Sequence, residues 1–175
     1  VARESKLRQA LGVTGETGIE YLHARGSGLR AVIASVRRWS KENPHGAVIL
    51  DSISRTGLGD LKTNETGNLF INMMNGLDCA WLAIGHPPRG DKEHLYGSVM
   101  FDAGEDIGVQ MRSELQGQKR GVALKVVKAN DMAFPPTAYY ALEFAEDGSG
   151  LTAIRPARQT EFSELAAGQK LTRMQ

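Results

Sequence analysis

The sequence predicts an α/β fold: a mainly parallel sheet flanked by helices, followed by antiparallel strands towards the C-terminus. Two continuous apolar runs, at 47–50 and 79–84, are typical of strands that are buried on both faces of a sheet. An amphipathic helical pattern precedes each run, and alternating helices and strands favour parallel pairing. From 122 onward, strands follow one another without helices between them, which favours antiparallel pairing.

Length and composition limit the classes of protein that the chain can represent. Its 175 residues predict one domain, 1–175, with room for a hydrophobic core. A net charge of +1 gives no bulk attraction to nucleic acid or membranes, so any such binding needs a local patch. The single cysteine, Cys79, cannot form an internal disulfide, and we expect a reducing, cytoplasmic location. No apolar run approaches the roughly 20 residues that span a bilayer, so no membrane association is expected.

The N-terminal part is expected to form two helices and a short strand. The first helix covers 3–11, and the strand covers 19–23. Ser27 is the expected N-cap of the second helix, because its hydroxyl can accept a hydrogen bond from a free backbone N–H. Asn43-Pro44 ends that helix, since the residue before a proline avoids the helical conformation. The apolar side chains on one face of the helix are Leu29, Val32, Ile33 and Val36.

Strands then alternate with helices until the C-terminal part. The remaining expected elements are a strand at 47–50, a helix near 64–76, strands at 79–84, 106–111, 122–127, 139–144 and 151–154, and a helix at 159–171. The strand at 151–154 is expected to pair back on 139–144 through the turn at 147–150. We expect the antiparallel strands to extend one edge of the parallel sheet.

Polar side chains stand where two of the predicted parallel strands end. Asp51 follows the first apolar run, and His86 follows the second after Gly85. Ligands of open α/β sheets bind beyond the carboxyl ends of the strands, so both side chains are candidate site residues. A structural role is open for each: Asp51 in a turn or helix cap, and His86 as a cap packed under Pro87-Pro88.

Five stretches, in this order, resemble the RecA-like ATPases, and most closely the branch of DnaB-type and RepA-type hexameric replicative helicases. They are GAVILDS (46–52), NETGNLF (64–70), WLAIGH (81–86), YGSVMFDAGEDIGVQM (96–111) and LKVVKAND (124–131). The resemblance implies a partial RecA-like core over about 19–145, followed by a C-terminal hairpin and tail over about 146–175. It also implies ATP and Mg²⁺, a ring-forming homo-oligomer with six subunits as in that branch, and single-stranded DNA as a partner.

The resemblance assigns roles to individual residues. Asp51 corresponds to the Walker B aspartate, which holds the magnesium ion on the phosphates of ATP. Ser52 and His86 belong to the nucleotide site, where His86 senses the γ-phosphate. Lys128 corresponds to a lysine that reaches ATP bound by the next subunit. Relatives often carry an arginine two residues later, where this chain has Asn130. Three explanations are open: Lys128 acts alone, Arg120 or Lys125 takes that place, or the contact with the next subunit is weak.

The loop before Gly97-Ser98 lies where relatives contact DNA. By the resemblance, Arg89 and Lys92 meet phosphates, and Tyr96 stacks on a base. An ordinary solvated loop is the alternative, because Asp91 and Glu93 offset the positive charge.

The phosphate-cradling loop of these ATPases, GxxxxGK followed by Ser or Thr, is absent from the sequence. This absence, with the start at Val1, favours the C-terminal portion of a longer ATPase; a relative that has lost nucleotide binding is the other explanation. The expected function is therefore part of a helicase or translocase. The alternatives are a non-catalytic scaffold that assembles or binds single-stranded DNA, and an unrelated α/β domain with a hydrolytic metal site.

Overall fold

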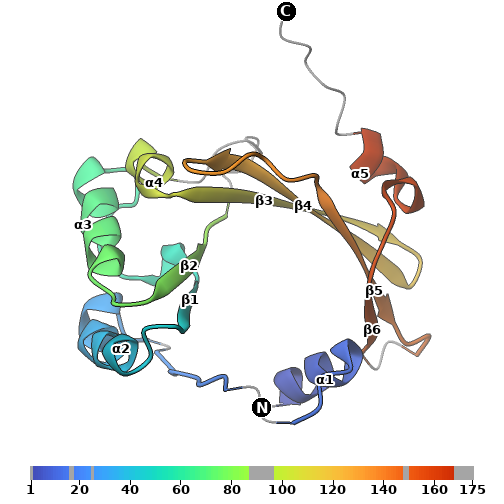
Figure 1. Ribbon diagram of the computed structural model, residues 1–175, viewed down its shortest axis with the longest axis horizontal. Coiled ribbons are helices and arrows are strands. Elements are labelled where there is room, and N and C mark those ends of the chain that lie inside the picture. The colour runs from blue at the N-terminus through green and yellow to red at the C-terminus, as the bar shows by residue number, and fades with distance from the viewer. Residues whose placement is uncertain (1, 16–17, 25, 87–96, 148–149, 168–175) are drawn as a thin grey trace, which may run out of the picture. The chain divides into compact units, whose positions relative to one another are not determined.

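A computed structural model describes residues 2–15, 18–24, 26–86, 97–147 and 150–167 (Figure 1). The helices are α1 (Ala2–Leu11), α2 (Leu29–Glu42), α3 (Asn64–Asn75), α4 (Val99–Gly104) and α5 (Ser163–Ala167), with 3₁₀ turns η1 (Ile53–Arg55) and η2 (Gln159–Glu161). The strands are β1 (Ala47–Asp51), β2 (Ala80–Ile84), β3 (Ile107–Gln116), β4 (Lys119–Ala129), β5 (Ala138–Phe144) and β6 (Leu151–Pro156).

The chain forms two compact units. One unit contains residues 20–105, and the other contains 1–19 together with 106–175. We refer to them as the β1–β2 unit and the antiparallel unit. The single domain over 1–175 stays a prediction.

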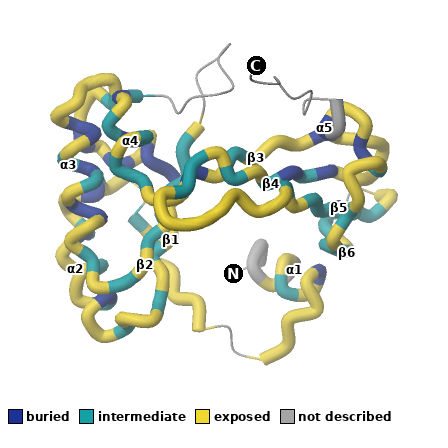
Figure 2. Tube along the Cα trace, turned by 45° about the horizontal axis from the view of Figure 1, so that its top comes forward, coloured by how far each residue is buried: buried dark blue, intermediate teal, exposed yellow. Residues whose placement is uncertain are grey.

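In the β1–β2 unit, two parallel strands pack against α2 and α3, which confirms the predicted parallel pair (Figure 1). Buried positions gather along both helices (Figure 2). The buried core consists of Leu29, Ile33, Ile53, Leu58, Phe70, Met73, Met74 and Phe101. The other face of the strands is open: Ile49 is 67% exposed and Leu82 is 53% exposed. Burial on both faces was therefore a wrong expectation for these strands, since the helices of this unit cover one side.

The antiparallel unit contains a separate four-stranded sheet in the order β3-β4-β5-β6. Two predictions were wrong: the strand at 106–111 does not join the parallel sheet, and the later strands do not extend its edge. The reason lies at the tight turn between Gln116 and Lys119, where Gly117 has φ +58°. Glycine adopts this conformation at little cost, so β3 pairs locally with β4 along its whole length. The predicted pairing of 151–154 with 139–144 is confirmed as β5–β6.

The C-terminal segment packs on one face of the antiparallel sheet. Phe162 is 1% exposed, and a Cβ added at Gly121 would come within 2.4 Å of its ring. The buried Glu114 carboxylate on β3 accepts the backbone N–H groups of Glu164 (2.9 Å) and Leu165 (3.1 Å). This carboxylate satisfies free donors at the start of α5 and holds that helix on the sheet.

Three predicted details of secondary structure were wrong. Residues 19–23 form no strand but an irregular segment. The N-cap of α2 is Gly28 rather than Ser27, and no side chain caps the helix. The described part of the predicted helix at 159–171 is a 3₁₀ turn followed by the short helix α5.

An ion-pair cluster on the antiparallel sheet gives stability that depends on pH. Arg155 Nη2 donates to Glu161 at 2.8 Å, and Arg155 Nε donates to Glu143 at 3.0 Å. The hydrogen bond from Arg155, helped by the backbone N–H of Arg158, lowers the pKa of Glu161 to about 2. The hydrogen bond from Arg155 also lowers the pKa of Glu143. A pKa that is lower in the folded state means that the charged carboxylates stabilise the fold above their unfolded pKa.

We expect this contribution to be full above about pH 4.5, the ordinary pKa of a glutamate, and to be lost as the pH falls towards 2. Urea unfolding of the unsubstituted protein and Glu161→Gln, followed from pH 6 to pH 2.5, measures it. The Gln variant should be less stable at pH 6, and the difference should shrink at the acid end. Glu146→Gln, at an exposed position, is the control. A difference that stays constant across this range would contradict the assignment.

Candidate functional site

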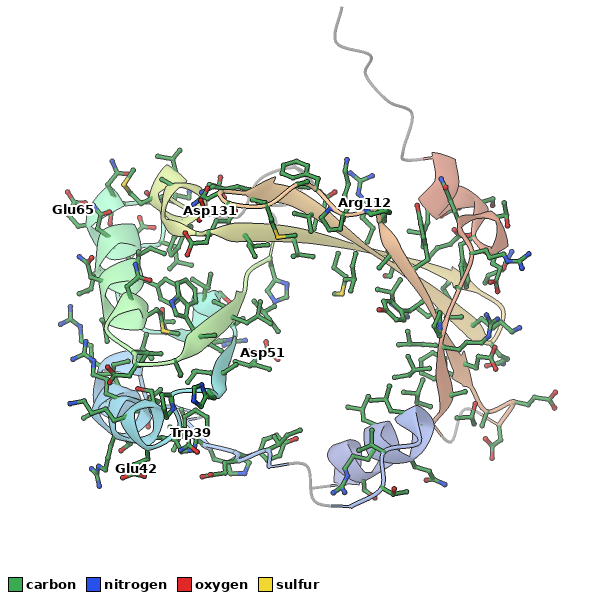
Figure 3. All side chains as sticks on the ribbon, in the orientation of Figure 1. Trp39, Glu42, Asp51, Glu65, Arg112 and Asp131 are labelled. Atoms are coloured by element: carbon green, nitrogen blue, oxygen red, sulfur yellow. The ribbon has the colours of Figure 1, made fainter. Side chains whose placement is uncertain are left out.

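Asp51 and Ile84 are register partners at the carboxyl ends of β1 and β2. His86 follows two residues after Ile84, so it stands at the same edge of the parallel pair as Asp51. The side chains of Asp51 and His86 are both exposed. Asp51 projects from the end of β1 away from α2 and α3, on the side of the strands that carries Ile49 (Figure 3). The carboxyl ends of β1 and β2 therefore lie at one edge of the parallel pair, within the β1–β2 unit.

The Asp51 carboxylate has the chemistry of a cation ligand. Among the described residues, no side chain or backbone group makes a hydrogen bond or ion pair with it. Carboxylate oxygens are the ligands that Mg²⁺ prefers, and an unpartnered carboxylate need not break a protein contact to bind the ion. Across the described ranges, no group of three or more His, Cys, Asp or Glu residues could hold a metal ion. A single carboxylate fits a magnesium that takes its other ligands from phosphates and water.

The segment after Asp51 turns back on the start of α2. The Asp51–Ser52 peptide bond is cis, and the buried Ser52 hydroxyl lies 2.9 Å from that of Ser54. Thr56 Oγ1 donates to the carbonyl of Ile53 at 2.8 Å. The carbonyl of Thr56 in turn accepts the backbone N–H of Leu29 at 2.7 Å. These bonds fix η1, and with it the backbone that directly follows Asp51, the candidate magnesium ligand.

A second junction joins the start of α3 to the start of α4. The Ser98 hydroxyl donates to Asn64 Oδ1 at 2.7 Å and accepts the N–H of Met100 at 3.1 Å. The backbone N–H of Ser98 donates to the carbonyl of Leu61 at 2.7 Å. Gly97 has φ +139°, and a Cβ there would come within 2.8 Å of the same carbonyl. Asn64 and Ser98 belong to two different stretches of the sequence resemblance, 64–70 and 96–111. Nothing in the neighbouring sequence of either residue predicts that their side chains form a hydrogen bond.

Lys128 and Asn130 belong to the antiparallel unit. Lys128 is half-buried on β4, opposite Gly108 of β3. Asn130 donates through Nδ2 to Asp106 Oδ1 at 3.1 Å, and its backbone N–H donates to the Asp106 carbonyl at 3.0 Å. Asn130 therefore joins the end of β4 to the start of β3.

Arg89, Lys92 and Tyr96, the predicted nucleic-acid contacts, lie outside the described residues. No helix in the described part of the chain has the length and apolar character needed to cross a membrane. Compared with known proteins, the chain matches no protein-family model and no curated sequence.

The Ser98–Asn64 bond can be measured by a double-mutant cycle. We expect Ser98→Ala to lower the free energy of unfolding by about 1–2 kcal/mol, because Asn64 Oδ1 and the Met100 N–H both lose a partner. Asn64→Ala should cost less in the Ser98→Ala background than in the unsubstituted protein. Ser35→Ala, at an exposed position on α2, controls for loss of a hydroxyl. Strictly additive losses would show that the two side chains do not interact.

Proposed function

We propose that this chain is a portion of an oligomeric RecA-like ATPase, a DNA helicase or translocase that couples ATP hydrolysis to movement on single-stranded nucleic acid. The observation that supports it best is the placement of Asp51 and His86 at the carboxyl ends of two neighbouring parallel strands. The order of the five sequence stretches supports the same family.

In this proposal, Asp51 holds Mg²⁺, directly or through water. An ion held there would supply positive charge that stabilises the phosphate oxygens of ATP. Ser52 lies beside Asp51 in the nucleotide site, and its bond to Ser54 fixes the turn that presents the carboxylate. Asp51 itself needs no rearrangement, because its carboxylate has no partner among the described residues.

His86 acts as the γ-phosphate sensor. Its imidazole donates a hydrogen bond to the phosphate when ATP is present and loses this partner after hydrolysis. The backbone next to His86 continues into 87–96, the segment to which we assign the nucleic-acid contacts Arg89, Lys92 and Tyr96. The far end of that segment is anchored where Ser98 bonds Asn64 and Leu61. Ser98 therefore fixes the backbone that follows this segment.

Lys128 reaches ATP held by the neighbouring subunit, alone or with Arg120 or Lys125, and neutralises charge that develops during phosphoryl transfer. Asn130 cannot serve as the missing arginine, since it is uncharged and bonded to Asp106. The chain has no GxxxxGK sequence, so the backbone cradle for the phosphates comes from another part of the complete protein. By itself this chain binds ATP weakly and hydrolyses almost none.

Weak binding at the proposed magnesium position can be detected with Mn²⁺·ATP, because the paramagnetic ion broadens the NMR signals of nearby nuclei. We expect selective broadening of the backbone amides of 51–54 and 84–86 at millimolar Mn²⁺·ATP, and loss of that pattern in Asp51→Asn. Asp78→Asn is the matched control, since Asp78 is an exposed carboxylate that precedes β2, at the opposite end of the parallel pair.

The same substitution tests catalysis in the complete protein that supplies the phosphate loop. Asp51→Asn should lower ATP turnover by about 10²–10³, the usual effect of removing one group that stabilises the transition state, and Asp78→Asn should leave it unchanged. Broadening that survives in Asp51→Asn, or equal turnover in the two variants, would refute the magnesium role.

A further inference from the structure

The α2 helix concentrates positive charge that the proposed nucleotide site does not use. It carries Arg30, Arg37, Arg38 and Lys41, all exposed, against one acidic residue, Glu42. We call these four cations the α2 basic surface. The whole chain has a net charge of only +1, so this helix departs from the average composition.

Helical geometry aligns three of these side chains. With 3.6 residues per turn, Arg30, Arg37 and Lys41 fall within a stripe about 40° wide, and Arg38 lies beside it. The stripe is about 16 Å long. Nitrogen-tipped side chains project from the outer side of α2 (Figure 3). The opposite side of the helix is occupied by core residues such as Leu29 and Ile33, so the charged side stays exposed.

The four cations are not neutralised within the described part of the chain. None of their side-chain nitrogens makes an ion pair or hydrogen bond with a described residue. A nearby carboxylate, Glu20, is engaged by Trp39 Nε1 at 3.0 Å. The Arg37 guanidinium lies against the turn after α3, where a Cβ at Gly76 would come within 3.1 Å of its Nη2. A row of unpaired cations fits a ligand with a row of negative charges.

The chemistry of the surface favours phosphates over a protein or membrane partner. No large apolar side chain is exposed on α2, so the helix lacks the buried apolar anchor of a protein interface. For the same reason it has no apolar face to insert into a lipid surface. Three of the four cations are arginines, whose planar forks bind phosphate oxygens in pairs. Along 16 Å, one strand of a DNA duplex presents about five phosphates.

We infer that the α2 basic surface binds the sugar–phosphate backbone of nucleic acid, separately from the contacts assigned to Arg89 and Lys92. The inference does not depend on ATP binding. All four cations lie on α2, which precedes β1 and Asp51 in the chain, and none of them has a role in the proposed nucleotide site. Binding through phosphates is sequence-independent and falls with salt, since each contact releases a condensed counterion.

The test measures binding of a fluorescein-labelled oligo(dT) 20-mer by anisotropy, without nucleotide, between 50 and 200 mM NaCl. The test variant combines Arg30→Gln, Arg37→Gln and Lys41→Gln. Its matched control combines Lys62→Gln, Arg112→Gln and Arg158→Gln, which removes the same charge from exposed positions elsewhere. Circular dichroism and thermal unfolding establish that both variants are folded.

In the test variant, we expect the slope of log affinity against log salt concentration to become less negative by about 2, because three phosphate contacts are lost at about 0.7 each. In the control variant, the slope should change little. Equal slopes in the two variants, or no binding of the oligonucleotide by the unsubstituted protein at 50 mM NaCl, would overturn the inference. Binding to vesicles of anionic lipid in place of the oligonucleotide would also overturn it. Loss of binding in Arg89→Gln/Lys92→Gln with no loss in the α2 variant would overturn it while leaving the proposed function intact.

Discussion

The parallel pairing of β1 with β2 is the constraint on which the candidate site depends. Side chains alternate between the faces of a strand, so the register of Asp51 with Ile84 decides both the edge and the face on which Asp51 lies. A slip of one residue would turn Asp51 towards α2 and α3 and expose Leu50 in its place. The core formed by Val48, Leu50 and Trp81 with the helices opposes that slip, because apolar side chains would then leave the covered face.

The same helices that hold this register present the unit's other chemistry. The apolar side of α2 packs against the strands, and its outer side carries the four cations that have no ion pair within the described part of the chain. The start of α3 is bonded through Asn64 to Ser98, which fixes the backbone that follows the proposed nucleic-acid segment. In our account, the nucleotide site, the γ-phosphate sensor and the polyanion-binding surface are therefore separate parts of this unit's surface. One small hydrophobic core holds all three in place.

Local sequence patterns predicted what depends on neighbouring residues. The apolar runs and the polar residues after them located β1, β2 and their ends, and the apolar face of α2 marked the side on which Leu29 and Ile33 are buried. Patterns failed where distant segments compete. Ser27 does not cap α2 because the Leu29 N–H is taken by the carbonyl of Thr56. The strand at 106–111 pairs with β4 through the turn at Gly117 instead of joining the parallel sheet. The resemblance, which implied one larger sheet, gave no information about which of these two pairings would form. Ser98 and Asn64 meet only in the folded chain. The sequence also cannot show that the α2 cations lack partners among the described residues.

The most direct test of the central claim is the register of β1 against β2 in solution. In the isotope-labelled chain, nuclear Overhauser effects between backbone protons should connect Leu50 with Ala83 and Asp51 with Ile84, in the pattern of parallel strands. This result would put Asp51 and His86 at one edge of the pair. Effects displaced by one residue, or none between the two strands, would separate the carboxylate from the histidine and contradict the account.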